Sequence, residues 1–218
     1  MRFRRAYYDL FSHVYDRVIA LHSGDASARL RDLLIGRTGI KAGGRLLDLC
    51  TGTGAVAVRA QTAVEPGGLV VGVDFSAGMI RQACVKAHQT GVADVAFVVG
   101  DAARLPFANA SFDAVSCSHA MYELSPEVRD RALQEASRVL RPGGRFVMME
   151  HCEPSRPFVR FLYRVRLSVL GSSENRDFAR DEVPFLSRYF ADVRRELSPK
   201  GRSKLIFGNK REGAETAG

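Results

Sequence analysis

The sequence of 218 residues is 46% hydrophobic and 26% charged, which is typical of one folded domain and excludes a disordered or fibrous chain. Its formal net charge of +8 favours anionic partners, whether a substrate, lipid headgroups or nucleic acid. The four cysteines form no CxxC pair, which argues against a disulfide framework or zinc site, and no apolar run reaches the roughly 20 residues needed to span a bilayer.

The first forty residues carry apolar positions at helical spacing. This spacing predicts two helices, at about 3–21 and 25–36, which we expect to cap the functional site. The basic start MRFRR is followed by YYDLFSHVYDR rather than by an apolar stretch, so no secretory signal peptide is indicated. Together with the scattered cysteines, this favours a cytoplasmic protein.

From residue 45 onward, β-branched runs alternate with helical stretches. Alternation of this kind builds βαβ units, so the predicted fold class is α/β, with a Rossmann-like and mostly parallel sheet. Ser76 and the pair Ser125–Pro126 are good helix starts, and the run Arg141–Gly144 is a good helix stop. We predict strands buried on both faces over 45–50, 69–74, 95–100, 112–118 and 145–150, and helices over 54–63, 76–90 and 126–140.

After the fifth strand, the sequence predicts two helices and then two strands. The helices cover 156–170 and 181–190, and the strands DVRREL (192–197) and SKLIFGN (203–209) form an antiparallel hairpin through SPKGR. This hairpin would complete a seven-stranded sheet. Residues 1–210 are therefore interpreted as one domain: cap helices in 1–40, a cofactor-binding core in 45–151 and a C-terminal part in 152–210, with a disordered tail at 211–218.

The run LLDLCTGTG (46–54) is a predicted strand that ends in a glycine turn. Gly52 and Gly54 allow a ligand to approach the backbone closely, and the following helix offers its positive end. Asp74 closes the second strand twenty residues later, where a carboxylate can accept hydrogen bonds from both hydroxyls of a ribose. Asp101 and Ala102 follow the third strand, from which they could contact an adenine edge. The pattern predicts an adenosine-containing ligand.

Two classes of cofactor fit this turn. Residues 52–57 also match the relaxed dinucleotide pattern G-x-G-x-x-[GA], so an NAD(P)-dependent oxidoreductase is one alternative, although no Tyr-x-x-x-Lys pair accompanies it. Asp48 and Asp101 favour S-adenosylmethionine, because its sulfonium and ammonium groups suit an acidic pocket better than a pyrophosphate would. A non-catalytic, regulatory S-adenosylmethionine-binding protein remains a further alternative.

Four segments together resemble the successive motifs of class I S-adenosylmethionine-dependent methyltransferases. They are DLCTGTG (48–54), VVGVDFSAGMIRQA (70–83), VVGDAARLPFANASFDAVSCSHAMYEL (98–124) and EASRVLRPGGRFVMMEH (135–151). The phrases D-A-x-x-L-P-F-x-x-x-S-F-D and R-V-L-R-P-G-G are similar to those of the UbiE/COQ5 group, whose members methylate quinone precursors. The group's relatives include small-molecule and phospholipid N-methylating enzymes.

The resemblance implies a role for each matching residue. Asp48, Gly52 and Gly54 would hold the methionine part, and Asp74 the ribose. The remaining expected cofactor contacts are Tyr15, Thr51, Phe75, Met79, Asp101, Ala102 and Ser118. For several of these a structural interpretation stays open: the glycines can serve only a tight turn, and Phe75 and Met79, four positions apart on a helix, can belong to the core.

The expected reaction is methyl transfer from S-adenosylmethionine to a small, lipophilic acceptor such as a quinone precursor or a phospholipid headgroup, with S-adenosylhomocysteine as product. His119, which follows the fourth strand, is the leading candidate for a general base, although lining or packing the pocket explains it as well. Helix 156–170 is basic and amphipathic, so it either docks on an anionic membrane surface, at the inner face of the membrane, or packs on the sheet. No metal and no nucleic-acid partner are expected.

Overall fold

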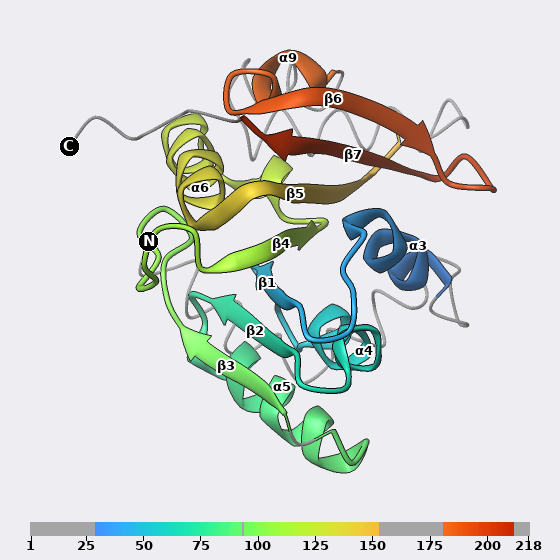
Figure 1. Cartoon of the computed structure of the whole chain (residues 1–218), viewed down its shortest axis with the longest axis vertical. Coiled ribbons are helices and arrows are strands. Elements are labelled where there is room, and N and C mark those ends of the chain that lie inside the picture. The colour runs from blue at the N-terminus through green and yellow to red at the C-terminus, as the bar shows by residue number, and fades with distance from the viewer. Residues whose placement is uncertain (1–28, 93, 153–180, 212–218) are drawn as a thin grey trace.

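The computed structural model describes residues 29–92, 94–152 and 181–211 (Figure 1). The helices are α3 (Arg29–Thr38), α4 (Ala55–Val64), α5 (Ala77–Gln89), α6 (Pro126–Val139) and the short α9 (Val183–Leu186), with a 3-10 turn η1 (Met121–Glu123). The strands are β1 (Arg45–Leu49), β2 (Leu69–Asp74), β3 (Val95–Val99), β4 (Phe112–Ser118), β5 (Leu140–His151), β6 (Phe190–Leu197) and β7 (Ser203–Lys210).

All seven strands form one sheet in the order β3-β2-β1-β4-β5-β7-β6 (Figure 1). The pairs among β1 to β5 are parallel, whereas β7 runs antiparallel to both β5 and β6. The predicted fold class, a mostly parallel Rossmann-like sheet with a C-terminal antiparallel hairpin, is confirmed. The chain leaves β1 toward β2 and β3 on one side and returns on the other side at β4. Ligands bind at such a switch point, outside the carboxyl ends of the strands.

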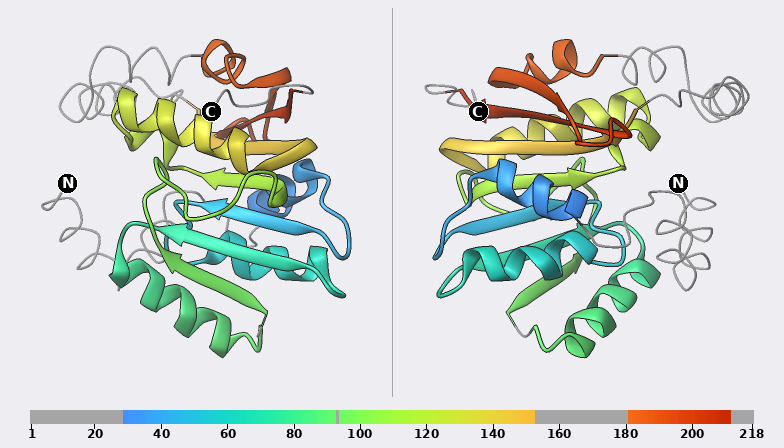
Figure 2. Two further views of the ribbon diagram at one scale, coloured as in Figure 1. Left: turned by 60° about the vertical axis from the view of Figure 1, so that its left-hand side comes forward. Right: turned by 90° about the vertical axis from the view of Figure 1, so that its right-hand side faces the viewer.

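Helices cover both faces of the sheet (Figure 2). On one face α3 and α4 pack through Leu34, Ile35 and Val56 against β1, β4, β5 and β7. On the other face α6 and α9 pack through Leu133 and Leu186. The central strands β1, β2 and β4 are buried because helices cover both of their faces. This packing fixes the strand ends that carry the candidate site.

The helix starts predicted from local sequence are confirmed. The Ser76 side chain accepts a hydrogen bond from the Met79 N–H at 3.1 Å and caps α5. Ser125 caps α6 in the same way through the Val128 N–H, with Pro126 in the first turn. A hydroxyl at the N-cap satisfies a backbone donor that has no partner within the helix, which is why these positions could be recognised in the sequence.

Two strands differ from the prediction. β3 lies at the edge of the sheet, so Val99 is 46% exposed and the strand is not buried on both faces. β5 begins at Leu140 rather than at residue 145, because Leu140 pairs with Phe112 across an irregularity in the β4–β5 ladder. The run Arg141–Gly144 does end α6, which stops at Val139, but it belongs to the strand.

The helix predicted over 181–190 is wrong in its extent. The structure has only the four-residue helix α9, and β6 starts at Phe190. The Phe190 side chain is buried and stacks on Phe146, with ring centroids 4.9 Å apart. Pairing of Phe190 with Lys210 in β7 therefore decides the conformation here against the local helical pattern.

The second predicted N-terminal helix corresponds in part to α3, which packs on a face of the sheet rather than acting only as a cap over its edge. Helices 3–21 and 156–170, the tail from residue 212 and Tyr15 lie outside the described residues. None of the helices among those described is long and apolar enough to cross a membrane.

Candidate active site at the carboxyl edge of the sheet

The segment between β1 and α4 makes a sharp turn. Cys50, Gly52 and Gly54 all have positive φ values, of 53°, 56° and 74°. The Thr51 N–H donates to the Val73 carbonyl at 2.9 Å, which extends the pairing of β1 with β2 past the end of β1. The turn therefore stays attached to the neighbouring strand, and α4 begins directly after it.

Gly54 is required by packing as well as by its backbone angle. A Cβ atom at this position would lie 2.8 Å from the Ala83 Cβ and 2.9 Å from the Phe97 ring. The glycine therefore lets the start of α4 approach α5 and β3 closely. The sequence left two roles open for Gly54, a close approach to a ligand or a tight turn alone. The close packing accounts for the tight turn, and this turn lies beside Asp74 at the carboxyl edge of the sheet.

Replacing Gly54 with alanine is expected to lower the free energy of unfolding by about 2–5 kcal/mol, from overpacking and from strain at positive φ. Gly67→Ala is a matched control, because Gly67 has φ of 79° and nothing within 4 Å of an added Cβ. It should cost only the backbone strain, about 1–2 kcal/mol. Urea unfolding of the two variants measures the difference, and equal losses would refute the packing role.

Asp74 connects the glycine turn to the start of α5. Its Oδ2 accepts a hydrogen bond from the Gly52 N–H at 2.9 Å, and its Oδ1 accepts one from the Ser76 N–H at 2.9 Å. The side chain is buried at the carboxyl end of β2. An ionised carboxylate accepts hydrogen bonds at both of its oxygens, and these two bonds fix the orientation of the group at the strand end.

Asp48 lies inside β1, buried, with both oxygens bonded to hydroxyls. Thr51 Oγ1 donates to Oδ2 at 2.6 Å and Ser116 Oγ donates to Oδ1 at 2.7 Å. Burial raises the pKa of Asp48 to about 6, the two hydroxyl bonds act in the opposite direction, and the charge of Asp74 adds to the rise. Asp48 thus ties the turn to β1 and β4 and would be stabilised by a cation close by.

The other expected cofactor contacts have varied surroundings. Met79 is 2% exposed, whereas Phe75 is 38% exposed, so the two side chains do not share one environment. The exposed Asp101 accepts a hydrogen bond from the Ala103 N–H at 2.9 Å, which is a turn interaction. Ala102 packs in the hydrophobic core. Asp101 nevertheless follows Gly100, whose N–H donates to the Asp74 carbonyl at 2.9 Å, so it belongs to the same edge.

Beyond β4 the edge carries two histidines. Ser118 ends β4, and His119 follows with a positive φ of 55°, its N–H donating to the Met149 carbonyl at 2.8 Å. Its ring stacks on His151 at the end of β5, with centroids 3.9 Å apart and an angle of 16° between the planes. The Nδ1 atom of His119 is buried and has no hydrogen-bond partner among the described residues, which makes it a candidate for contact with a ligand.

Burial also decides the charge of His119. It lowers the pKa of His119 well below its usual value, and the nearby charges of His151 and Arg31 act in the same direction. The ring is therefore neutral near pH 7, with one nitrogen able to accept a proton.

Glu150 holds the loop after His119 in place. Its Oε1 accepts a hydrogen bond from the Met121 N–H at 3.0 Å, at the start of η1. Burial raises the pKa of Glu150 well above its usual value, and Glu182 and Glu123 add to the rise. Glu182 itself forms a buried ion pair with Lys204 of β7. The hairpin thus contributes to the support of the loop that carries His119.

The order and spacing of these features have a match among known proteins. Residues 5–182 match the model of the ubiE/COQ5 methyltransferase family. The chain belongs to this family. It is 33% identical to the Hahella chejuensis "Ubiquinone/menaquinone biosynthesis C-methyltransferase UbiE", over 76% of this chain and 68% of that protein. It is 30% identical to a demethylmenaquinone methyltransferase of Lactococcus lactis, over 87% of this chain and 69% of that protein.

The fold agrees with the family assignment. A crystal structure of a SAM-dependent methyltransferase from Aquifex aeolicus superposes with a TM-score of 0.66 at 19% identity, covering 87% of this chain and 96% of that one. The protein is therefore an S-adenosylmethionine-dependent methyltransferase of the ubiE/COQ5 family. Membership also decides between the two cofactor classes that the glycine turn left open, in favour of S-adenosylmethionine.

Ser116, His151 and Glu150 were missed in the sequence. Ser116 is opposite Asp48 in the β1–β4 register, 68 positions away, and only the strand pairing brings the two together. His151 ends the motif over 135–151, but no local signal indicates that it stacks on His119. For Glu150 there was a weak signal, since a charged residue inside an otherwise apolar strand needs a partner.

Proposed function

We propose that this enzyme methylates a carbon atom of a small, lipophilic quinone precursor. The observation that carries the proposal is the identity of about 30% to proteins named as ubiquinone/menaquinone C-methyltransferase and demethylmenaquinone methyltransferase over most of this chain. A phospholipid headgroup is the other acceptor expected from the sequence.

The residues at the carboxyl edge fit S-adenosylmethionine. Asp74 is a carboxylate at the end of β2 that is oriented by two backbone N–H groups, and a carboxylate at this place can accept hydrogen bonds from both hydroxyls of a ribose. Asp48 is a buried carboxylate with hydroxyl partners, so a sulfonium or ammonium nearby would offset the cost of burying its charge. We assign the ribose to Asp74, and the methionine part to Asp48 and the turn Thr51–Gly54. We place Ser118 beside the methyl group. The adenine surroundings are assigned to Phe75, Met79, Asp101 and Ala102.

We assign proton removal to His119. Bound S-adenosylmethionine supplies an electrophilic methyl group, and an aromatic carbon that accepts it must then lose its proton. Since that carbon is strongly acidic once methylated, a weak base is sufficient. His119 is neutral near pH 7, directly follows β4, and has a buried ring nitrogen without a hydrogen-bond partner in the part of the chain that the structure describes. His119 takes the proton that leaves this carbon.

The pairing of His119 with His151 predicts a measurable pH effect. His151→Phe keeps an aromatic ring in the stack but removes one neighbour that can carry positive charge. Cationic neighbours disfavour protonated His119, so its pKa should move up, yet stay below the usual value because burial and Arg31 remain. NMR titration of the imidazole signals measures this midpoint.

His88 is a matched control for this titration, since it is exposed on α5. His88→Phe should leave the His119 midpoint unchanged. A midpoint that is the same in His151→Phe and in the wild-type enzyme would show that the two rings do not interact electrostatically.

The acceptor can be tested directly. The protein is incubated with S-adenosylmethionine labelled in its methyl group and, separately, with a short-chain demethylmenaquinol, with phosphoethanolamine or with phosphatidylethanolamine vesicles. We expect label in the quinol product, attached to a ring carbon, as read by mass spectrometry. Label only in an amine product would overturn the proposed acceptor and leave the methyltransferase assignment intact.

A further inference from the structure

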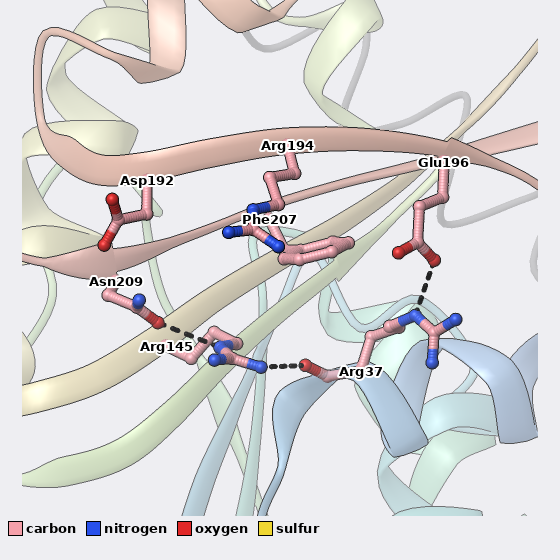
Figure 3. A pocket seen from close by; sticks show the side chains of 7 residues that line it. All are labelled: Arg37, Arg145, Asp192, Arg194, Glu196, Phe207 and Asn209. Atoms are coloured by element: carbon pink, nitrogen blue, oxygen red, sulfur yellow. Dashed lines mark hydrogen bonds and ion pairs between the residues drawn. The ribbon is translucent and has the colours of Figure 1, made fainter.

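A second candidate site lies away from the carboxyl edge of the sheet, between the end of α3 and the strands β5, β7 and β6 (Figure 3). It is a pocket of about 420 Å³, within the range of small-ligand sites. Arg145, which lines it, precedes His151 by six residues on β5, or about 20 Å of strand. The pocket is therefore separate from the candidate active site. It is lined by Arg37, Arg145, Asp192, Arg194, Glu196, Phe207 and Asn209.

The charges around this pocket do not cancel. Arg37 is paired with Glu196, with 2.7 Å between Nε and Oε2. Within the part of the chain that the structure describes, neither Arg145 nor Arg194 forms an ion pair with a carboxylate. Arg145 donates instead to neutral oxygens, the Asn209 Oδ1 at 2.9 Å and the Arg37 carbonyl at 3.4 Å. Two arginines thus share the pocket with one further carboxylate, that of Asp192, which forms no ion pair within the described residues.

The pocket is organised before any ligand binds. The two hydrogen bonds and the Phe207 ring, whose centroid is 5.8 Å from the guanidinium carbon, hold the Arg145 side chain in place. A cation that is already ordered loses little conformational freedom on binding an anion. Arg194 points from β6 toward the same space (Figure 3).

The edge strand β6 is irregular where it borders the pocket. Its register shifts between Ala191 and Arg194, and Asp192 adopts a positive φ of 52°. Bulges of this kind redirect side chains and recur near binding sites. Asp192 and Arg194 point to the same side of β6, as Glu196 does (Figure 3).

The guanidinium groups of Arg145 and Arg194 and the carboxylate of Asp192 together favour one class of ligand. Guanidinium groups match the oxygens of a phosphate, whereas the Asp192 carboxylate repels an anion but accepts a hydrogen bond from a hydroxyl. We propose that this pocket binds a phosphate ester that carries a hydroxyl group, with the phosphate on Arg145 and Arg194 and the hydroxyl on Asp192. Free glycerol phosphates and the headgroup of phosphatidylglycerol share this chemistry.

Calorimetry with the full chain and glycerol 3-phosphate tests the proposal. Arg194→Gln should raise the Kd at least about tenfold, because it removes charge-assisted hydrogen bonds to the phosphate. Arg81→Gln is the matched control, since Arg81 is exposed on α5 and its loss changes the net charge equally. Asp192→Asn should weaken glycerol 3-phosphate relative to inorganic phosphate. The affinity for S-adenosylhomocysteine, measured on each variant, should be unchanged, which shows that the variants are folded.

Vesicles distinguish the two sources of the ligand. A lipid headgroup is supported if the wild-type protein sediments with phosphatidylglycerol vesicles but not with phosphatidylcholine vesicles, and if Arg194→Gln abolishes this sedimentation. Binding of free glycerol 3-phosphate without vesicle binding supports a soluble ester. The proposal is overturned if wild-type protein binds neither probe, or if Arg81→Gln weakens binding as much as Arg194→Gln does.

Discussion

Asp74→Asn is expected to weaken the binding of S-adenosylhomocysteine by roughly 100-fold. Two charge-assisted hydrogen bonds to ribose hydroxyls are worth about 3 kcal/mol together, which corresponds to this factor. Asp74 now accepts hydrogen bonds from the Gly52 and Ser76 N–H groups. The asparagine also places its NH2 group against one of these two donors. Both effects act at the same edge of the sheet, and calorimetry measures their sum.

Asp94→Asn is a control of the same chemistry, since Asp94 is exposed just before β3. It should leave the affinity within about twofold, a difference that corresponds to about 0.4 kcal/mol. The free energy of unfolding is measured for both variants, because Asp74 also holds the turn. Unchanged affinity in Asp74→Asn would show that the ribose lies elsewhere.

His119→Asn is expected to reduce kcat about 10²–10⁴-fold while the affinity for S-adenosylhomocysteine changes little. Asparagine suits the test because it tolerates the positive φ of 55° better than other residues that carry a side chain. It removes the imidazole to which we assign proton removal and leaves the residues of β1 and β2 unchanged. Single-turnover kinetics with the quinol acceptor isolates the chemical step.

The pH profile gives a second measure of the His119 role. Since the pKa of His119 is lowered well below its usual value, the neutral, basic form persists from pH 8 down past the usual histidine range. The rate should therefore be flat near neutrality and fall only in more acidic solution. His88→Asn should keep both the rate and the profile of the wild-type enzyme. A His119→Asn variant with nearly normal kcat would remove the histidine from the mechanism.

Much of the candidate site at the carboxyl edge of the sheet could be predicted because it depends on local sequence. The turn Cys50–Gly54, Asp74 at the end of β2 and the Ser76 cap belong to two successive strand-to-helix connections. Each has a local signature: glycine for positive φ, a carboxylate at a strand end, a hydroxyl before a helix. The direct contact between Gly52 and Asp74 follows from the parallel pairing of β1 with β2, which the alternation of elements already implied.

Other elements depended on partners that are distant in the sequence. The residues 181–190 have a helical pattern, yet pairing with β7 makes Phe190 part of a strand. The run 95–100 has the composition of a buried strand, but β3 lies at the sheet edge with β2 as its one neighbouring strand, and Val99 is exposed there. Propensity is a weak prior, and tertiary contacts override it in both cases.

The sequence by itself determined the fold class, the glycine turn, the carboxylate at the end of β2 and the helix cap beside it, because periodicity, turns and caps are properties of neighbouring residues. Only the tertiary structure decided that Ser116 holds Asp48, that His151 stacks on His119, and that Arg145 and Arg194 share a pocket. These contacts depend on strand register and on the order of strands in the sheet. A shift of one residue in register turns each side chain to the opposite face.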